Sequence, residues 1–324
     1  VLGNGDCSKM TKAVKVVVVG SINMDIVIEA AHLPVPGETV LGGDYQTYPG
    51  GKGANQAVAA AKLGAETTMI GAVGADAFGK ALTMNLASYG IRTEAVMHKT
   101  DTTSRIALIA IDKRSRDNTI IVSGGANRQL TVEDMTFAVD IIKAADVLIC
   151  QLEIPLDAVQ AALKIAKNHG VITMLNAAPM CELPDALLAL VDHLIVNETE
   201  AQQLSGYPIN ELEDIEQASA ILLGKGIDKI VLTMGGKGAN VVDAEHRHYL
   251  PAFPVNVLDT VGAGDAFVGA YAVAIAQGRS LTEALKFGNA VGALATTKSG
   301  AQTGSSTAEE VQQFLAGFQK KEYI

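Results

Sequence analysis

Short runs of β-branched and other apolar residues recur along the chain, and they constrain its fold more than any other feature. The first run, VKVVVVG at 14–20, is apolar except for one lysine. Such a run is typical of a strand that is buried on both faces of a parallel sheet. Five similar runs follow at 67–73, 146–152, 171–177, 193–197 and 229–235.

Segments with helical character separate most of these runs. They cover 55–63, 77–89, 155–169, 198–204 and 214–224, and the chain from Ala263 onwards is mostly helical in pattern. Alternation of strands and helices predicts an α/β fold, with a doubly wound, mostly parallel sheet flanked by helices. With 324 residues, 48% of them hydrophobic, the chain is long and apolar enough to bury the core of such a fold.

Two stretches interrupt this alternation. Residues 25–50 alternate apolar and polar side chains and contain turn prolines, and 105–125 has the pattern of a hairpin with its turn near Ser115 to Asn118. Together they predict a small β-sheet lid that projects from the main body. An ordinary extension of the main sheet edge explains the same patterns, so the sequence alone leaves both alternatives open.

The chain has no internal repeat and no convincing linker. We therefore expect a single α/β domain over 14–324, with lid strands inserted at about 25–50 and 105–125. Residues 1–13 are expected to be flexible and in part foreign to the native sequence. No apolar stretch has the length of a membrane span, and the three cysteines lack metal-ligand spacing. These features favour a cytoplasmic protein.

Charge and the usual phosphate motifs exclude several classes of function. The formal net charge is −10, which disfavours nucleic acids and anionic membranes as partners. GSINMD follows the first predicted strand where a dinucleotide-binding dehydrogenase would have GxGxxG. GGKG at 50–53 lacks the spacing of a P-loop.

The segment DTVGAGDAFVGA at 259–270 places three small residues before a helix-compatible run. Gly262, Ala263 and Gly264 let a ligand approach the backbone, and amides at the start of a helix bind anions. Asp265 at the mouth of such a site has the chemistry of a general base next to a transferring phosphoryl group. The alternative is that Asp265 only complements the helix dipole.

Together, GGKGANQAVAAAKLGA at 50–65 and DTVGAGDAFVGA at 259–270 resemble the two signature regions of the PfkB carbohydrate kinase family. GSINMD, QLE, NETE, TMGGKG and KSGAQ also occur in the family's order. The likeness extends from about Val16 to about Phe314, and it is greatest to members that phosphorylate ribose.

This resemblance implies ATP-dependent phosphorylation of D-ribose at its 5-hydroxyl. Asp265 would be the general base, and Gly262, Ala263 and Gly264 would form the anion hole. Carboxylates and carboxamides suit a pentose with several hydroxyls. The sugar site implied by the resemblance consists of Asn23, Asp25, Gly51, Lys52, Asn55, Glu153 and Asp265. For three of these residues simpler roles remain: a helix cap for Asn55, a strand-end turn for Asp25 and a solvated charge for Lys52.

The resemblance also implies a nucleotide site and two cations. The residues expected to bind ATP are Asn197, Thr233, Gly235, Gly236, Lys237, Gly238, Gly264 and Asn289. Glu200 would help to organise Mg²⁺ indirectly, although a first-turn helix acid is a simpler role for it. K⁺ would bind mostly to backbone carbonyls, and its expected ligands are Asp259, Val261, Ala295, Lys298, Gly300 and Gly304.

The sequence departs from the family pattern in two places. Gly304 stands where many relatives have Ser, with Ser305 next along, and this leaves the last K⁺ ligand open. Ala177 stands where relatives often have Pro, a change that we expect to be structural only. The resemblance further implies a homodimer formed through the lid. Alternative functions are a kinase for deoxyribose, another sugar or a nucleoside, and a non-catalytic sugar-binding protein.

Overall fold

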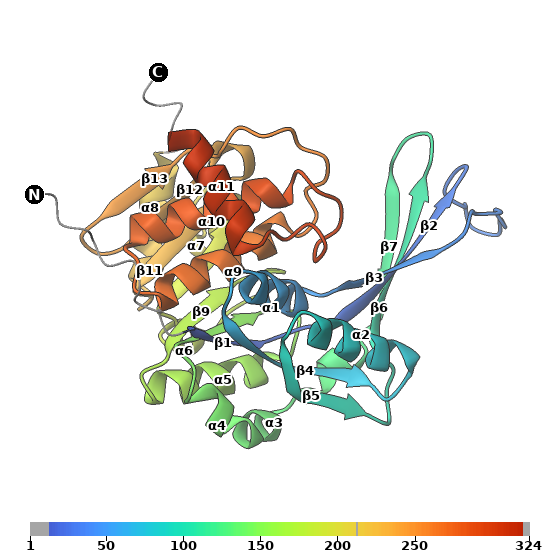
Figure 1. The fold of residues 1–324 in the computed structure, drawn as a ribbon, viewed down its shortest axis with the longest axis horizontal. Helices are drawn as coiled ribbons and strands as arrows, with labels where there is room; N and C mark the ends of the chain where they lie inside the picture. The colour runs from blue at the N-terminus through green and yellow to red at the C-terminus, as the bar shows by residue number, and fades with distance from the viewer. Residues whose placement is uncertain (1–12, 212, 320–324) are drawn as a thin grey trace, which may run out of the picture.

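A nine-stranded sheet forms the centre of the protein, and the computed structural model describes residues 13–211 and 213–319 (Figure 1). The strand order is β13-β12-β11-β10-β9-β8-β1-β4-β5. All adjacent pairs from β5 to β11 are parallel, and β12 is antiparallel to both of its neighbours. The strands are β1 (Lys15–Val19), β4 (Glu66–Gly74), β5 (Arg92–Lys99), β8 (Val147–Gln151), β9 (Ile172–Asn176), β10 (His193–Asn197), β11 (Lys229–Thr233), β12 (Ala239–Val242) and β13 (Arg247–Leu250).

Helices cover both faces of this sheet, because successive side chains of each strand point to opposite faces. Val16 and Val18 of β1 belong to one buried cluster, and Val17 and Val19 belong to another. The first cluster is covered by α1 (Lys52–Lys62), α2 (Ala77–Ser88), α9 (Ala263–Ala276), α10 (Leu281–Ala295) and α11 (Ala308–Gln319). The second is covered by α3 (Val132–Phe137), α4 (Val139–Ile142), α5 (Leu156–Asn168), α6 (Asp185–Leu188), α7 (Glu198–Ser205) and α8 (Asp214–Leu223). The predicted doubly wound α/β fold is therefore confirmed.

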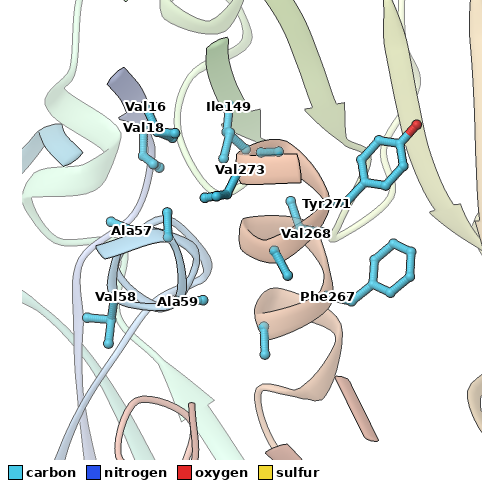
Figure 2. Close-up of a cluster of buried hydrophobic side chains, with 14 of the residues drawn as sticks. Val16, Val18, Ala57, Val58, Ala59, Ile149, Phe267, Val268, Tyr271 and Val273 are labelled. Atoms are coloured by element: carbon cyan, nitrogen blue, oxygen red, sulfur yellow. The ribbon is translucent and has the colours of Figure 1, made fainter. Parts of the chain in front are cut away.

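Helix α9 is apolar on nearly all sides, since it lies between the sheet, α1 and α10. Val268 and Val273 of this helix gather with Val16, Val18 and Ile149 of the sheet in one buried cluster (Figure 2). A Cβ added to Gly269 would lie 2.7 Å from the carbonyl oxygen of Gln56. Helices α1 and α9 are therefore in close backbone contact, which brings their first turns together.

The small sheet has the order β3-β2-β6-β7 and projects from one side of the main body (Figure 1). Its strands are β2 (Asn23–Ala30), β3 (Gln46–Gly50), β6 (Arg105–Asp112) and β7 (Asn118–Val122). The lid prediction is thus correct in its location, and the alternative of an extended edge of the main sheet is wrong. Only residues 20–22 connect β1 of the large sheet to β2 of the small one.

Some elements differ from the prediction. Strand β13 ends at Leu250, because Pro251 and Pro254 of the following segment cannot donate to a ladder. The helix expected from Asn55 begins three residues earlier, at Lys52. Strands β5 and β12 were not predicted; β5 lies at the edge of the sheet, and Val96 is its single buried residue.

The N-terminal extension predicted for residues 1–13 lies, except for its last residue, outside the described part of the chain. Within the described part, none of the helices combines the length and apolar character that crossing a membrane requires.

Candidate active site

The start of α1 lies directly against the link between the two sheets. Gly51 caps the helix with a φ of +94°, and an added Cβ would lie 2.7 Å from the carbonyl oxygen of Ser21. A Cβ on Gly53 would come equally close to the backbone of Gly20. Both positions therefore require glycine for packing. Because Gly51 is the N-cap, the alternative role of Asn55 as a helix cap is wrong.

Asp265 lies in the first turn of α9 and is only 9% exposed. Its Oδ2 accepts a hydrogen bond from Nδ2 of Asn55 at 2.9 Å, and its Oδ1 accepts one from Nε2 of Gln56 at 3.0 Å. Burial raises the pKa of Asp265, while the Lys52 charge and the two amide donors oppose this rise. The carboxylate is thus held by both of its oxygens and has the raised pKa that suits a general base.

The N-terminus of α9 presents free amides beside this carboxylate. Gly262 is the N-cap with a φ of +78°, and a Cβ there would lie 2.6 Å from Cα of Ala301. The amide of Ala263 donates to the carbonyl of Thr260 at 3.2 Å, but those of Gly264 and Asp265 have no acceptor among the described residues. A Cβ on Gly264 would meet no atom within 4 Å. An anion could therefore reach two unpaired donors at the positive end of a helix.

Charged and polar side chains gather where β2, α1 and the end of β8 meet. Glu153 accepts hydrogen bonds from Oγ of Ser21 at 2.5 Å, from the amide of Lys52 at 3.2 Å and from the Arg105 guanidinium at 3.2 Å. Burial and the neighbouring Glu153 raise the pKa of Asp25 to about 6, although Arg105 opposes them. Asp25 lies within β2, so the alternative of a strand-end turn is wrong.

Two further predicted sugar ligands belong to the same cluster. Oδ1 of Asn23 accepts a hydrogen bond from Nδ2 of Asn127 at 2.8 Å. The amide of Lys52 donates to Glu153 at 3.2 Å, and the Lys52 charge opposes the rise that burial causes in the pKa of Asp265 and of Glu200. The structure therefore brings together the residues predicted for the sugar site.

Several residues of this cluster were not predicted from the sequence. Arg105 pairs with Glu153 from the first residue of β6, where an isolated arginine has no distinctive sequence signal. Asn127 binds the backbone of Ile22 with both of its amide atoms, at 3.2 Å each. Gln56 directly follows the predicted Asn55, and this adjacency was the one signal that could have revealed it.

The predicted nucleotide residues surround the ends of β10, β11 and β13. Asn197 and Glu200 form a reciprocal capping box at the start of α7, with both hydrogen bonds 2.8 Å long. The simpler role of Glu200 as a first-turn acid therefore accounts for its main contact. Burial raises the pKa of Glu200, and the amide of Asn197 lowers it.

The glycine-rich loop after β11 has two different halves. A Cβ on Gly235 or Gly236 would meet no atom within 4 Å, so this half leaves space for a ligand. Gly238 has a φ of +109°, and a Cβ there would clash with the carbonyl of Leu250. Nδ2 of Asn289 donates to the same carbonyl at 3.2 Å. Beside this loop, Thr233 donates to the carbonyl of Val196 and Lys237 pairs with Glu198 at 2.9 Å.

The segments predicted to bind K⁺ converge next to the start of α9. The carboxylate of Asp259 accepts hydrogen bonds from the amides of Val261 and Gly300, at 3.0 Å each. A Cβ on Gly304 would lie 2.6 Å from the carbonyl oxygen of Gly300 and 3.4 Å from that of Ala295. Among the described residues, no group of three or more His, Cys, Asp or Glu side chains is placed to hold a metal. A cation here would depend on backbone carbonyls, which suit K⁺.

Two side chains near these carbonyls are directed elsewhere. The ammonium of Lys298 pairs with Glu310 at 2.7 Å, so only the backbone of Lys298 is left as a ligand. Oγ of Ser305 donates to the carbonyl of Ala301 at 3.2 Å. The Ser305 hydroxyl therefore does not take the place of the serine that many relatives have at the position of Gly304.

Comparison with known proteins finds similarity over most of the chain. Residues 13–308 match the family model described as pfkB family carbohydrate kinase. The chain is 39% identical to a ribokinase from Haemophilus influenzae over 298 residues, which are 92% of this chain and 97% of the relative. It is 36% identical to a deoxyribokinase from Salmonella typhi over 302 residues, covering 93% and 98% of the two chains. The structure of Arabidopsis thaliana ribokinase complexed with ribose and ATP superposes with a TM-score of 0.89 at 33% identity, covering 94% and 99%.

Proposed function

Because the chain belongs to the pfkB family of carbohydrate kinases, we propose that it transfers the γ-phosphoryl group of ATP to the 5-hydroxyl of D-ribose. The observation that carries this proposal is the position of Asp265. Its buried carboxylate lies between a cluster of polar side chains and the free amides that begin α9. The similarity to ribokinases, one of them bound to ribose and ATP, supports ribose as the acceptor.

The reaction follows from this arrangement. Asp25, Asn23 and Glu153 bind sugar hydroxyls and direct the 5-hydroxyl toward Asp265. Asp265 accepts the hydroxyl proton while the sugar oxygen forms a bond to the γ-phosphorus, and the bond to the β-phosphate oxygen breaks to release ADP. The amides of Gly264 and Asp265 stabilise the negative charge on the transferring group, and Gly262 and Ala263 form the turn that presents these amides.

The nucleotide would bind across the edge formed by β10, β11 and β13. Gly235 and Gly236 leave space for it, and Asn197, Thr233, Lys237, Gly238 and Asn289 frame that space. Mg²⁺ would enter with the nucleotide and neutralise phosphate charge. Glu200 acts on it indirectly, because its carboxylate already accepts the amide of Asn197.

We also propose that K⁺ activates the enzyme. The converging carbonyls of Ala295 and Gly300, beside the Asp259 carboxylate, fit a cation held by oxygen ligands. The backbone of Val261, Lys298 and Gly304 completes the proposed set. A bound cation would supply fixed positive charge next to the anion hole.

The central experiment is Asp265→Asn. This change preserves shape and removes the base, so we expect turnover with ribose to fall by about 10³-fold while ribose still binds. Turnover should be measured by coupled ADP release, and ribose binding by calorimetry. An unchanged turnover would contradict the role of Asp265.

Deoxyribose is the main alternative acceptor, since the chain is also 36% identical to a deoxyribokinase. The two sugars differ in one hydroxyl, and a site built to hydrogen-bond that hydroxyl rejects its absence strongly. Values of kcat/KM for ribose, deoxyribose and adenosine would decide between them. Equal values for ribose and deoxyribose would contradict the substrate proposed.

A homodimer through the small sheet is our further proposal for its assembly. Ile120, Ile121 and Val122 of β7 are 51%, 65% and 47% exposed, and Leu108 of β6 is 43% exposed. Leu108 and Ile121 pair across β6 and β7 and share one face of the small sheet, whereas Ile120 and Val122 lie on its other face. The sheet therefore exposes more apolar surface than single exposed residues would explain. Sedimentation should give twice the chain mass, and Ile121→Lys should shift the species to a monomer.

We place this enzyme, as one kinase domain over 14–324, in the cytoplasm, where ATP is available.

A further inference from the structure

The buried amide side chains beneath Asp265 all have one orientation. Nε2 of Gln56 donates to Oδ1 of Asp265, and Oε1 of Gln56 accepts from Nε2 of Gln151 at 2.7 Å. The second proton of the Gln56 amide is also used, since Nε2 lies 3.0 Å from Oδ1 of Asn176. Gln56 and Gln151 are both fully buried. These side chains form a first chain of hydrogen bonds, which approaches Asp265 from the side of the large sheet.

A second chain reaches the other carboxylate oxygen. Nδ2 of Asn85 on α2 donates to Oε1 of Gln302 at 2.7 Å, and Nε2 of Gln302 donates to Oδ1 of Asn55 at 3.1 Å. Nδ2 of Asn55 then donates to Oδ2 of Asp265. The backbone carbonyl of Gln302 is itself held by the Lys62 ammonium at 3.0 Å. The second chain therefore joins the loop after α10 to the carboxylate of Asp265.

The direction of both chains follows from the acceptor at their common end. An ionised carboxylate only accepts hydrogen bonds, so the NH₂ group of Asn55 and that of Gln56 must face it. Their carbonyl oxygens then face away and require donors, which Gln302 and Gln151 provide. A reversed amide anywhere would place two like groups together in a buried site. Each chain thus favours the ionised form of Asp265.

On this basis we infer that Gln56 and Gln302 are positioning residues, which hold the Asp265 carboxylate ionised and fixed in plane for proton transfer. Gln302 lies outside the cluster described above, and Gln56 belongs to it through its hydrogen bond to Asp265. One donor on each oxygen prevents rotation of the carboxylate and leaves the remaining lone pairs for the sugar hydroxyl. The inference depends on the proposed function for its catalytic meaning, but the hydrogen bonds can be tested without a substrate.

The charges facing Asp265 set the background against which these amides act. Lys52 on α1 favours the ionised carboxylate, and Glu153 after β8 disfavours it. Burial also disfavours ionisation and is the largest influence. Because hydrogen bonds to a charged group are strong, removing one amide donor should visibly raise the pKa of Asp265.

The test uses Gln56→Met and Gln302→Met, which keep the length of the side chain and remove its hydrogen bonds. Gln160→Met on α5, a half-buried residue away from the site, is the matched control. Protein labelled with ¹³C at the aspartate carboxyl carbon reports the titration of Asp265, and Asp265→Asn assigns its resonance. The titration should move to higher pH in Gln56→Met, by less in Gln302→Met, and not in the control.

Kinetics with ribose and ATP provide the second measurement. In Gln56→Met we expect the acid limb of the kcat–pH profile to move to higher pH, so that the loss of kcat is larger at low pH than at high pH. The KM for ribose should stay within about twofold. Gln56→Glu keeps the shape of the side chain but places a like charge against Asp265. The acid limb of the kcat–pH profile should therefore move furthest in this variant.

The outcomes separate this inference from the proposed function. Folded variants of Gln56 and Gln302 that both leave the Asp265 titration unchanged would overturn the inference, as would a loss of kcat independent of pH. If Gln56→Met does not fold, Gln302→Met alone decides. A shifted titration in an enzyme that does not phosphorylate ribose would support the inference and contradict the proposed substrate.

Discussion

The sugar side and the phosphate side of the site both depend on glycine, but for opposite reasons. On the sugar side, a Cβ at Gly51 or Gly53 would lie 2.7 Å from backbone atoms of the link between β1 and β2. On the phosphate side, a Cβ at Gly264 or Gly236 would meet no protein atom within 4 Å. The first pair is required for packing of the protein against itself, whereas the second leaves space for a ligand.

The difference shows how much of the site is assembled before any ligand arrives. On the sugar side, Glu153 already accepts hydrogen bonds from Ser21, Lys52 and Arg105. On the phosphate side, the amides of Gly264 and Asp265 lack acceptors among the described residues. Substitutions on the two sides should therefore affect different properties, namely stability on the first and catalysis on the second.

The largest effect is expected for Gly51→Ala. A side chain there combines an unfavourable positive φ with an overlap against Ser21, so the free energy of unfolding should fall by about 3 kcal/mol. Gly37→Ala is the matched control, because Gly37 has a φ of +85° and open space around it. Urea unfolding should show a loss of only about 1 kcal/mol for this control. Equal losses in both variants would contradict the role of packing at Gly51.

Next in size is the effect of Gly264→Ala, which should appear in turnover. A methyl group in the open space over the free amides would displace the transferring phosphoryl group, and kcat should fall about 100-fold. The free energy of unfolding should change by less than about 0.5 kcal/mol, since no protein atom is near. A stability loss as large as that of Gly51→Ala would show that the two sides do not differ.

Asp25→Asn should sharpen the comparison through its pH dependence. The pKa of Asp25 is about 6 in the folded protein and 3.8 as its ordinary value, so folding opposes its ionisation. At pH 7.5 the ionised carboxylate therefore destabilises the fold, and the asparagine variant should be more stable by about 3 kcal/mol. This gain should shrink as the pH falls below 6 and disappear below about pH 3, where the aspartate is neutral in both states.

The same residue should link sugar binding to pH. In the unmodified enzyme, the KM for ribose should rise as the pH falls below 6, while the KM for ATP should not follow this change. A carboxamide does not titrate in this range, so the Asp25→Asn variant should have a raised KM for ribose that no longer depends on pH. A parallel pH dependence of both KM values would contradict the assignment of Asp25 to the sugar side.

The smallest effect is expected for Gly236→Ala in the loop after β11. Its surroundings are open, so we expect no measurable loss of stability. The KM for ATP should rise about threefold, because the methyl group occupies part of the space proposed for the nucleotide. A normal KM for ATP would place the nucleotide away from Gly236.

Much of this fold follows from its sequence pattern. Each of the six predicted apolar runs became a strand, because a buried parallel strand has no polar side and its pattern is unmistakable. Edge elements were harder to predict. Strand β5 has a single buried residue, Val96, and short helices such as α4 and α6 depend on tertiary contacts.

The site was predictable only as far as its motifs extend. Asp265 and Asn55 lie in recognisable segments, and the structure joins them by a hydrogen bond of 2.9 Å. Gln302 lies 247 positions from Asn55, and the partnership between them depends on how α10 and its loop return to α1. Arg105 is similar, since only the parallel pairing of β6 with β2 brings it to Glu153. Contacts of this kind arise from topology.

Strand β2 belongs to the small sheet and also carries Asn23 and Asp25. Asn127 holds the backbone of Ile22 just before this strand, so the link has a fixed point from which β2 extends. Any rotation of the small sheet about that point would carry with it both of these side chains, which we propose to bind sugar hydroxyls. The movement that uncovers the proposed pentose site would then also break the hydrogen bonds to the sugar hydroxyls. A phosphorylated sugar would therefore lose its contacts as the site opens.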